Sequence, residues 1–217
     1  MVLLLAGCAN PAGVASPESP APSTSTGAPS PSASVDPSAP EGATLVVHAE
    51  RIEVLATDGA VIEDADLLTE TGEVLGVLEE AFGAEPTPTT YGIQGLEGPP
   101  GTKYDWGGLA VYVTDEEYGP AFDRIALEIS APAIGDVSVR TAAGLSVGSP
   151  VTDLDRGDLI WDEDGLLIFD VEPVVIGTAA DFGYEGEPDA EFIWSVMAHS
   201  DGSTVTKLFS PRKNYGV

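Results

Sequence analysis

Basic side chains are scarce in this sequence. Lysine and arginine supply 8 of its 217 residues against 36 aspartates and glutamates, which gives a formal net charge of −28. Affinity for phosphates requires clustered cations, so the composition argues against a nucleic-acid partner. It also argues against purely electrostatic attachment to an anionic lipid surface. The charge instead favours partners that are themselves positively charged.

Cysteine and long apolar runs are nearly missing as well. Cys8 is the single cysteine, and the longest apolar run, at the N-terminus, is far shorter than the ~20 residues that a membrane-spanning helix needs. The rest of the chain therefore has no disulfide, thiolate metal ligand or cysteine nucleophile. Because 43% of the residues are apolar, burial alone can stabilise a domain of this length.

The sequence offers little acid–base chemistry near neutral pH. Only His48 and His199 are histidines. His199, Ser200 and Asp201 are neighbours in sequence and so cannot converge as a catalytic triad, and we predict that His199 lies in an exposed turn. The P-loop, the dinucleotide-binding glycine pattern and the His-Glu-x-x-His motif are absent. We therefore expect a protein that is not an enzyme and needs no cofactor.

The residues Leu5-Ala6-Gly7-Cys8 form the most specific motif in the chain. They end a short apolar segment, as does the last part of a secretory signal. The motif resembles the lipobox of bacterial lipoproteins. The resemblance implies that signal peptidase II cleaves before Cys8, that the thiol carries a diacylglycerol, and that a fatty acid such as palmitate can acylate the new amino group. The alternatives are an ordinary secretory signal and a buried strand.

Three segments are expected along the chain. No lysine or arginine precedes Arg51, so we interpret residues 1–7 as the remnant of a longer signal peptide whose charged start lies upstream of Met1. Residues 8–43 comprise the lipidated Cys8 and a tether in which proline, serine and alanine fill 24 of the 35 positions after the cysteine. Such a composition predicts disorder. Residues 44–217 are expected to form an acidic globular domain.

The overall composition bears on where the protein is found. It is rich in alanine, glycine and aspartate, and in this it resembles proteins from high-GC actinobacteria. Together with the lipobox, this resemblance implies export and lipid anchoring to the outer face of the cytoplasmic membrane. The membrane is then a partner through the lipid on Cys8.

The periodicity of the folded part predicts an α+β domain, mostly antiparallel sheet. Asp58-Gly59, Asp164-Gly165 and Asp201-Gly202 each predict a two-residue hairpin turn. Further strands are expected at Tyr104–Val113 and Phe122–Ser130. Apolar residues at helical spacing predict a main helix over about 69–82, and Ser149-Pro150 predicts a short helix over about 150–155.

A helix followed by strands thus occurs twice. This order resembles the tandem helix-on-sheet modules of β-lactamase-inhibitor proteins, and the resemblance implies a possible tandem repeat. Chance similarity is the alternative.

Two groups of residues are candidate sites. The acidic stretch from residue 153 to 164 offers hard oxygen ligands for a divalent cation, and a solvated acidic hairpin is the alternative. Its candidate ligands are Asp153, Asp155, Asp158, Asp162 and Asp164. Tyr104 and Trp106 share one face of an expected strand and could bind a sugar or a partner, whereas packing in the core is the alternative.

We interpret the chain as a cell-envelope lipoprotein whose acidic extracytoplasmic domain is a non-enzymatic binding or interaction module. Its partner would be a cationic protein or a cell-wall ligand. The alternatives are a cell-wall hydrolase that uses paired carboxylates and a surface protein that binds a divalent cation.

Overall fold

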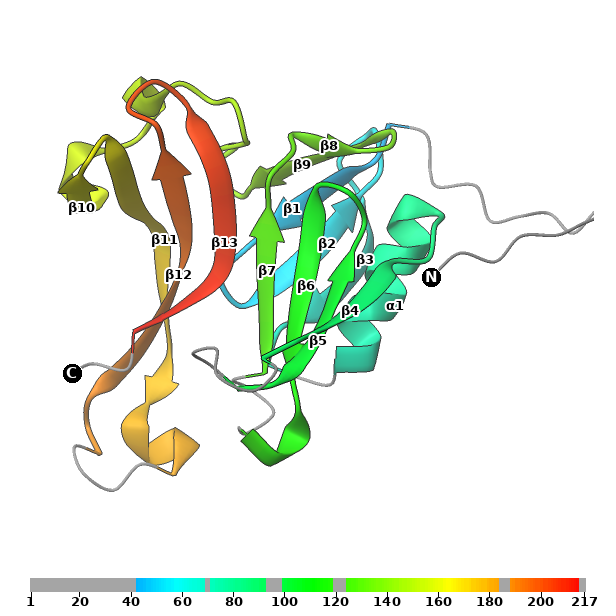
Figure 1. Cartoon of the computed structure of the whole chain (residues 1–217), viewed down its shortest axis with the longest axis horizontal. Coiled ribbons are helices and arrows are strands. Elements are labelled where there is room, and N and C mark those ends of the chain that lie inside the picture. The colour runs from blue at the N-terminus through cyan, green and yellow to red at the C-terminus, as the bar shows by residue number, and fades with distance from the viewer. Residues whose placement is uncertain (1–41, 69–70, 93–98, 119–123, 184–187, 215–217) are drawn as a thin grey trace, which may run out of the picture. The chain divides into compact units, whose positions relative to one another are not determined.

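The computed structural model describes residues 42–68, 71–92, 99–118, 124–183 and 188–214 (Figure 1). Contacts between residues divide the chain after Ser34, and every described residue belongs to the second unit, Val35–Val217. The expected signal remnant at 1–7, Cys8 and the tether up to residue 41 lie outside the described residues.

A five-stranded sheet has the strand order β3-β2-β1-β9-β8. Its strands are β1 (Thr44–Val47), β2 (Arg51–Leu55), β3 (Val61–Asp66), β8 (Ala133–Ile134) and β9 (Val137–Thr141). All its neighbouring strands are antiparallel except β1 and β9, which run parallel. This parallel pair joins segments more than 90 residues apart, since Thr44 lies opposite Ser138.

An eight-stranded antiparallel sheet has the order β10-β11-β12-β13-β7-β6-β5-β4. The strands are β4 (Thr87–Tyr91), β5 (Gly101–Asp105), β6 (Leu109–Thr114), β7 (Ile125–Ile129), β10 (Leu159–Glu163), β11 (Leu166–Thr178), β12 (Glu191–Ser200) and β13 (Val205–Asn214). The expected α+β class with mostly antiparallel sheet is therefore confirmed.

The main helix, α1 (Thr71–Phe82), ends where the prediction placed it, and residues 69–70 lie outside the described residues. Val74, Leu78 and Ala81 are its buried face, and the helix contacts β3 and β2. Gly83 ends it in a left-handed conformation, with φ of 59°. Within the described part of the chain, no helix is long and apolar enough to cross a membrane.

One cluster of buried side chains forms the core. It includes Leu45 from β1, Leu78 from α1, Leu127 from β7 and Trp194 from β12, none of them more than 1% exposed. Residues of both sheets and of the helix thus share a single apolar interior.

The Asp164-Gly165 pair forms the predicted two-residue turn. Glu163 lies opposite Leu166, and both turn residues have positive φ, 53° at Asp164 and 82° at Gly165. This conformation matches the right-handed twist of the two strands that it joins, β10 and β11.

The Asp58-Gly59 pair joins β2 and β3 in the predicted hairpin, but the prediction of a two-residue turn is wrong. Leu55 lies opposite Val61, so five residues form the loop, and only Gly59 has positive φ. The carboxylate of Asp58 accepts a hydrogen bond from the N–H of Ala60 at 3.0 Å. An aspartate that bonds the backbone two residues later stabilises a wider turn.

The third pair, Asp201-Gly202, also lies in a wider loop than predicted. Ser200 pairs with Val205, which leaves four residues between them, and only Gly202 of the pair has positive φ. Asp201 Oδ1 accepts hydrogen bonds from the two N–H groups of residues 203 and 204, at 2.8 and 2.9 Å. These hydrogen bonds from the backbone to Asp201 stabilise the wider loop in place of a two-residue turn.

Two further predictions need correction. The single strand expected at Tyr104–Val113 is two strands, β5 and β6, because Gly107 adopts a φ of 80° and the chain reverses there. The helix expected over 150–155 is one turn of 3-10 helix, η3 (Val151–Asp153). Leu154 is extended and ends it, and a second turn, η4 (Arg156–Asp158), follows. Among the described residues, the other 3-10 turns are η1 (Glu116–Tyr118) and η5 (Ala179–Phe182).

Candidate functional site

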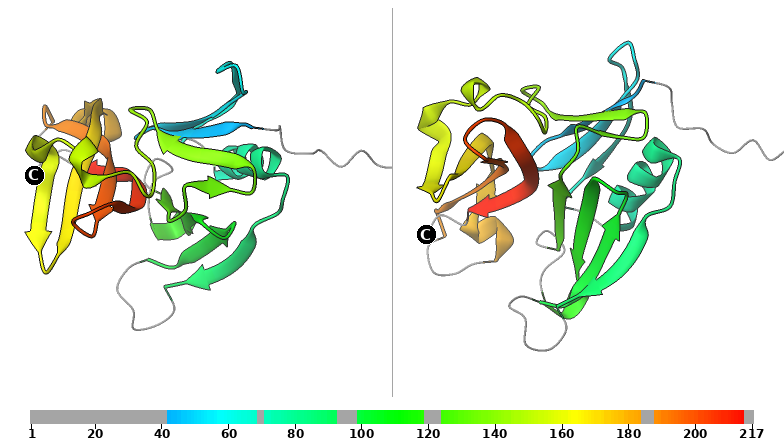
Figure 2. Two further views of the ribbon diagram at one scale, coloured as in Figure 1. Left: turned by 90° about the horizontal axis from the view of Figure 1, so that it is seen from above. Right: turned by 45° about the horizontal axis from the view of Figure 1, so that its top comes forward.

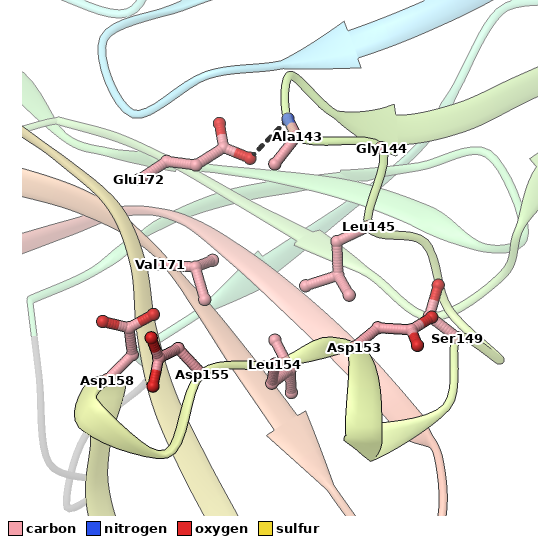
Figure 3. Close-up of a pocket in the computed structure, with 10 residues that line it drawn as sticks. All are labelled: Ala143, Gly144, Leu145, Ser149, Asp153, Leu154, Asp155, Asp158, Val171 and Glu172. Carbon is pink, nitrogen blue, oxygen red and sulfur yellow. Dashed lines mark hydrogen bonds between the residues drawn. The ribbon is translucent and has the colours of Figure 1, made fainter.

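A cavity of about 470 Å³ lies beside the segment that connects β9 to β10 (Figure 3). Three parts of the chain contribute to it: the loop after β9, the two 3-10 turns η3 and η4, and β11. Its walls are Ala143, Gly144, Leu145, Ser149, Asp153, Leu154, Asp155, Asp158, Val171 and Glu172. We call this cavity the acidic pocket.

A bulge in β11 supplies one wall of the acidic pocket. The pairing of β11 with β12 shifts register between Val171 and Val174, and Glu172 there has a φ of 54°. A residue other than glycine seldom adopts this conformation. The carboxylate of Glu172 accepts a hydrogen bond from the N–H of Ala143 at 2.8 Å, which ties the loop after β9 to the sheet (Figure 3).

The opposite wall consists of η3, η4 and the residues between them. Asp155 Oδ1 accepts a hydrogen bond from the N–H of Gly157 at 2.8 Å and thereby caps η4. The hydroxyl of Ser149 accepts one from the N–H of Ser146 at 3.0 Å. These local bonds present Asp153, Asp155 and Asp158 to the acidic pocket.

The acidic pocket combines an apolar interior with anionic edges. Leu145, Leu154 and Val171 lie in its middle, Asp155 and Asp158 on one side of them and Asp153 on the other (Figure 3). No lysine, arginine or histidine is among its lining residues.

Within the described part of the chain, the carboxylates of Asp153 and Asp158 have no hydrogen-bond or ion-pair partner. Apolar walls with unpaired carboxylates suit an organic cation on an aliphatic stem, such as a lysine or arginine side chain.

The structure brings together part of the predicted metal-ligand set. Asp153, Asp155 and Asp158 line the acidic pocket, whereas Asp162 lies in β10 and Asp164 in the β10–β11 turn. Among the described residues, no group of three or more histidine, cysteine, aspartate or glutamate side chains could hold a metal ion. Binding of a divalent cation by these residues stays a prediction.

Sequence reasoning missed Glu172, which belongs to the acidic pocket. Pro173 could have revealed the bulge that contains Glu172, because a proline inside a run of β-forming residues marks an edge or a bulge. Strand β11 runs from Leu166 to Thr178 with this bulge in its middle.

The loop after β9 also contains the pattern Gly144-Leu145-Ser146-Val147-Gly148, which matches the nucleophile motif of α/β-hydrolases. That motif places an exposed serine between a strand and an α-helix. Here the hydroxyl of Ser146 donates a hydrogen bond to the carbonyl oxygen of Val139 at 2.7 Å, and the 3-10 turn η3 follows. Neither histidine lines the acidic pocket. The pattern therefore forms a glycine-rich turn here, with no activated nucleophile.

A second acidic groove, of about 630 Å³, lies between β3 and α1 and includes Glu63 and Glu80. Burial raises the pKa of Glu63, and the charge of Glu80 and a hydrogen bond with it raise this pKa further. Glycosidases hold their two carboxyl groups about 5–9.5 Å apart, so a hydrogen-bonded pair lacks their geometry. The hydrolase interpretation stays a prediction that this pair does not favour.

Tyr104 and Trp106, the candidate binding aromatics, are half-buried and pack against the core. The ring centroid of Trp106 is 5.7 Å from that of Phe82 in an edge-on contact, and its Nε1–H donates to the carbonyl oxygen of Ala84 at 2.9 Å. These contacts hold the β5–β6 turn against the end of α1. They favour the structural role of Trp106 over a sugar-binding role.

The prediction that His199 lies in an exposed turn is wrong. His199 lies within β12, half-buried, and its ring centroid is 4.7 Å from that of Phe209. Its Nε2 is buried and has no hydrogen-bond partner among the described residues. Burial lowers the pKa of His199, and the charge of Lys207 lowers it further, although Glu128 opposes them. Both effects favour the neutral imidazole.

We expect this histidine to make stability depend on pH. Because the pKa of His199 is lowered on folding, the unfolded chain binds the proton first, and stability falls as pH drops below about 6.5. Denaturant unfolding at pH 7.5 and 5.5 measures this, with His199→Gln as the comparison. The pH dependence should be smaller in the variant, and an equal dependence in both proteins would contradict the assignment. The pKa values of Glu53 and Glu128 are also lowered, but these two groups change the folding stability only below about pH 4.5.

Comparisons with protein family models, with curated proteins and with solved structures found no match to this chain.

Proposed function

We propose that this chain is an exported lipoprotein, anchored through Cys8 at the outer face of the cytoplasmic membrane, whose acidic domain binds a cationic ligand without catalysing a reaction. The motif Leu5-Ala6-Gly7-Cys8 and the proline-rich segment after it support the anchor and the tether. The acidic pocket is the observation that carries the binding function.

The size and chemistry of the acidic pocket support a cationic ligand. A cavity of about 470 Å³ lies within the range of small-ligand sites, about 300–1,000 Å³. Leu145, Leu154 and Val171 can cover an aliphatic stem, while Asp153 and Asp158 are free to pair with an amino or guanidinium group. The net charge of −28 attracts such a ligand from a distance. A basic side chain of a protein and an amino group of the cell wall both fit this description.

The test uses agmatine as the probe, which carries a guanidinium and an amino group at the two ends of a four-carbon chain. In a titration followed by amide chemical shifts, we expect agmatine to change the shifts of residues 143–158 and 171–172. The double variant Asp153→Asn, Asp158→Asn should weaken binding about tenfold or more, which corresponds to about 1.4 kcal/mol. The double variant Glu79→Gln, Glu85→Gln is the matched control, because it removes the same charge from exposed positions outside the acidic pocket.

Three outcomes would count against this proposal. One is the absence of shifts at millimolar agmatine, and another is an equal loss of binding in the control variant. The third is saturation of the same residues by calcium chloride but not by agmatine, which would favour the divalent-cation interpretation instead.

A further inference from the structure

One edge of the eight-stranded sheet is open. Strand β10 stands at the end of the strand order and, among the described residues, pairs only with β11 (Figure 2). A strand at the edge of a sheet presents unpaired N–H and C=O groups on its outer side. Such an edge can accept an additional strand from another chain.

The backbone alternation identifies which groups point outward. Glu163 and Leu166 flank the two-residue turn, and in such a hairpin this pair exchanges both its hydrogen bonds. The next residue back, Asp162, then directs its N–H and C=O away from β11. The open edge of β10 therefore offers a donor and an acceptor at residue 162.

The β10–β11 hairpin also exposes large apolar side chains. The exposed fractions are 44% for Ile160 and 52% for Trp161 on β10, and 38% for Leu166 at the start of β11. Tryptophan is the residue most typical of the energetic centre of a protein interface. An exposed Trp161 beside an open strand edge is thus suited to contact an added segment.

The charge around this edge selects the partner. Asp158, Asp162, Glu163 and Asp164 lie in or beside β10, and Arg156 is the one basic residue of the segment 151–178. A second copy of this acidic chain would bring like charges together at the edge, which opposes pairing. A segment rich in lysine or arginine would place its cations opposite these carboxylates.

We propose that the open edge of β10 binds an extended cationic segment of a partner protein as an added β-strand, with Trp161 as its apolar contact. This inference deepens the proposed function and rests on it for the charge of the partner. Asp158 connects the two sites, because it lines the acidic pocket and immediately precedes β10. A strand bound along β10 can therefore reach toward the acidic pocket with a basic side chain.

The probe is a six-residue peptide of alternating lysine and valine, added to the full chain and followed by amide chemical shifts. We expect perturbation of residues 160–163. N-methylation of alternate peptide residues should weaken binding about tenfold or more, because it removes the donors needed for strand pairing. A peptide with glutamate in place of lysine should not bind.

Protein variants test the same contact from the other side. Asp162→Pro removes the outward N–H, which an edge strand tolerates, whereas Asp162→Ala removes only the charge. We expect the proline variant to lose at least about tenfold more affinity for the peptide than the alanine variant. Trp161→Ala should also weaken binding.

The outcomes separate this inference from the proposed function. Equal binding of the methylated and unmethylated peptides would overturn strand addition, and agmatine binding would then still support the acidic pocket. Strand addition without agmatine binding would overturn the acidic pocket as a site for small cations, while leaving the edge of β10 as a binding site. A concentration-dependent dimer that Asp162→Pro abolishes would identify a second copy as the occupant and overturn the cationic partner.

Discussion

Replacing Cys8 by alanine is expected to move the protein from the membrane fraction to the soluble fraction. In the proposed mature form, the thiol of Cys8 carries a diacylglycerol. Each buried methylene contributes about 0.8 kcal/mol, and two acyl chains hold a protein on a bilayer essentially permanently. Fractionation of a bacterial host that exports the chain measures the effect, and mass spectrometry of the N-terminal peptide identifies the modification.

The matched control for this experiment is Ser16→Ala, which changes one hydroxyl in the same proline-rich segment and leaves the motif intact. It should stay with the membrane. An unmodified thiol on Cys8 in the wild-type protein would contradict the lipid anchor. Membrane association of Cys8→Ala equal to that of the wild type would contradict it as well, because the protein would then be held by other contacts.

Truncating the core at Leu127 is expected to cause a large loss of folding stability. Leu127 is 1% exposed on β7, within the cluster shared by both sheets and α1. Removing its buried side-chain atoms leaves a cavity in that cluster, so Leu127→Ala should lower the free energy of unfolding by about 2–5 kcal/mol. Urea unfolding followed by tryptophan fluorescence and by circular dichroism provides the measurement.

Val61→Ala is the comparison for Leu127→Ala, because Val61 is 55% exposed on β3. Its effect should stay within about 0.5 kcal/mol. The single core also predicts that both probes report one transition, since strands of both sheets lose their packing together. Two separate transitions, with Leu127→Ala shifting only one, would contradict a shared core and would favour the tandem repeat, which stays a prediction.

Local sequence signals predicted the elements whose residues interact with near neighbours. Helix α1 follows from apolar residues at helical spacing and from Gly83 at its end. The Asp164-Gly165 turn follows from the conformations that these two residues tolerate. In both cases, contacts within a few residues determine the structure.

Other predictions failed where a short-range contact that the pattern did not reveal altered the backbone. At residues 150–155, the extended Leu154 and the cap that Asp155 supplies to η4 replaced the expected helix. In the hairpins at Asp58 and Asp201, side-chain hydrogen bonds to the backbone widened the turns. Such bonds depend on side-chain geometry, which residue type alone does not specify.

The acidic pocket shows the same division between sequence and structure. The acidic stretch directed attention to Asp153, Asp155 and Asp158, and the structure places all three on one cavity. Glu172, which lines the same cavity, comes from a bulge in β11, and no pattern within residues 153–164 could reveal it. Asp162, in β10, and Asp164, in the β10–β11 turn, do not line this cavity.

By itself, the sequence determined the sign of the charge, the α+β class, the main helix and one tight turn, because composition and local spacing decide each of them. Only the tertiary structure decided which carboxylates share a cavity, which strand edge stays open and where His199 is buried. These features arise from pairings between distant segments, such as β1 with β9 and β7 with β13. Burial of a common core selects such pairings, and no single segment encodes them.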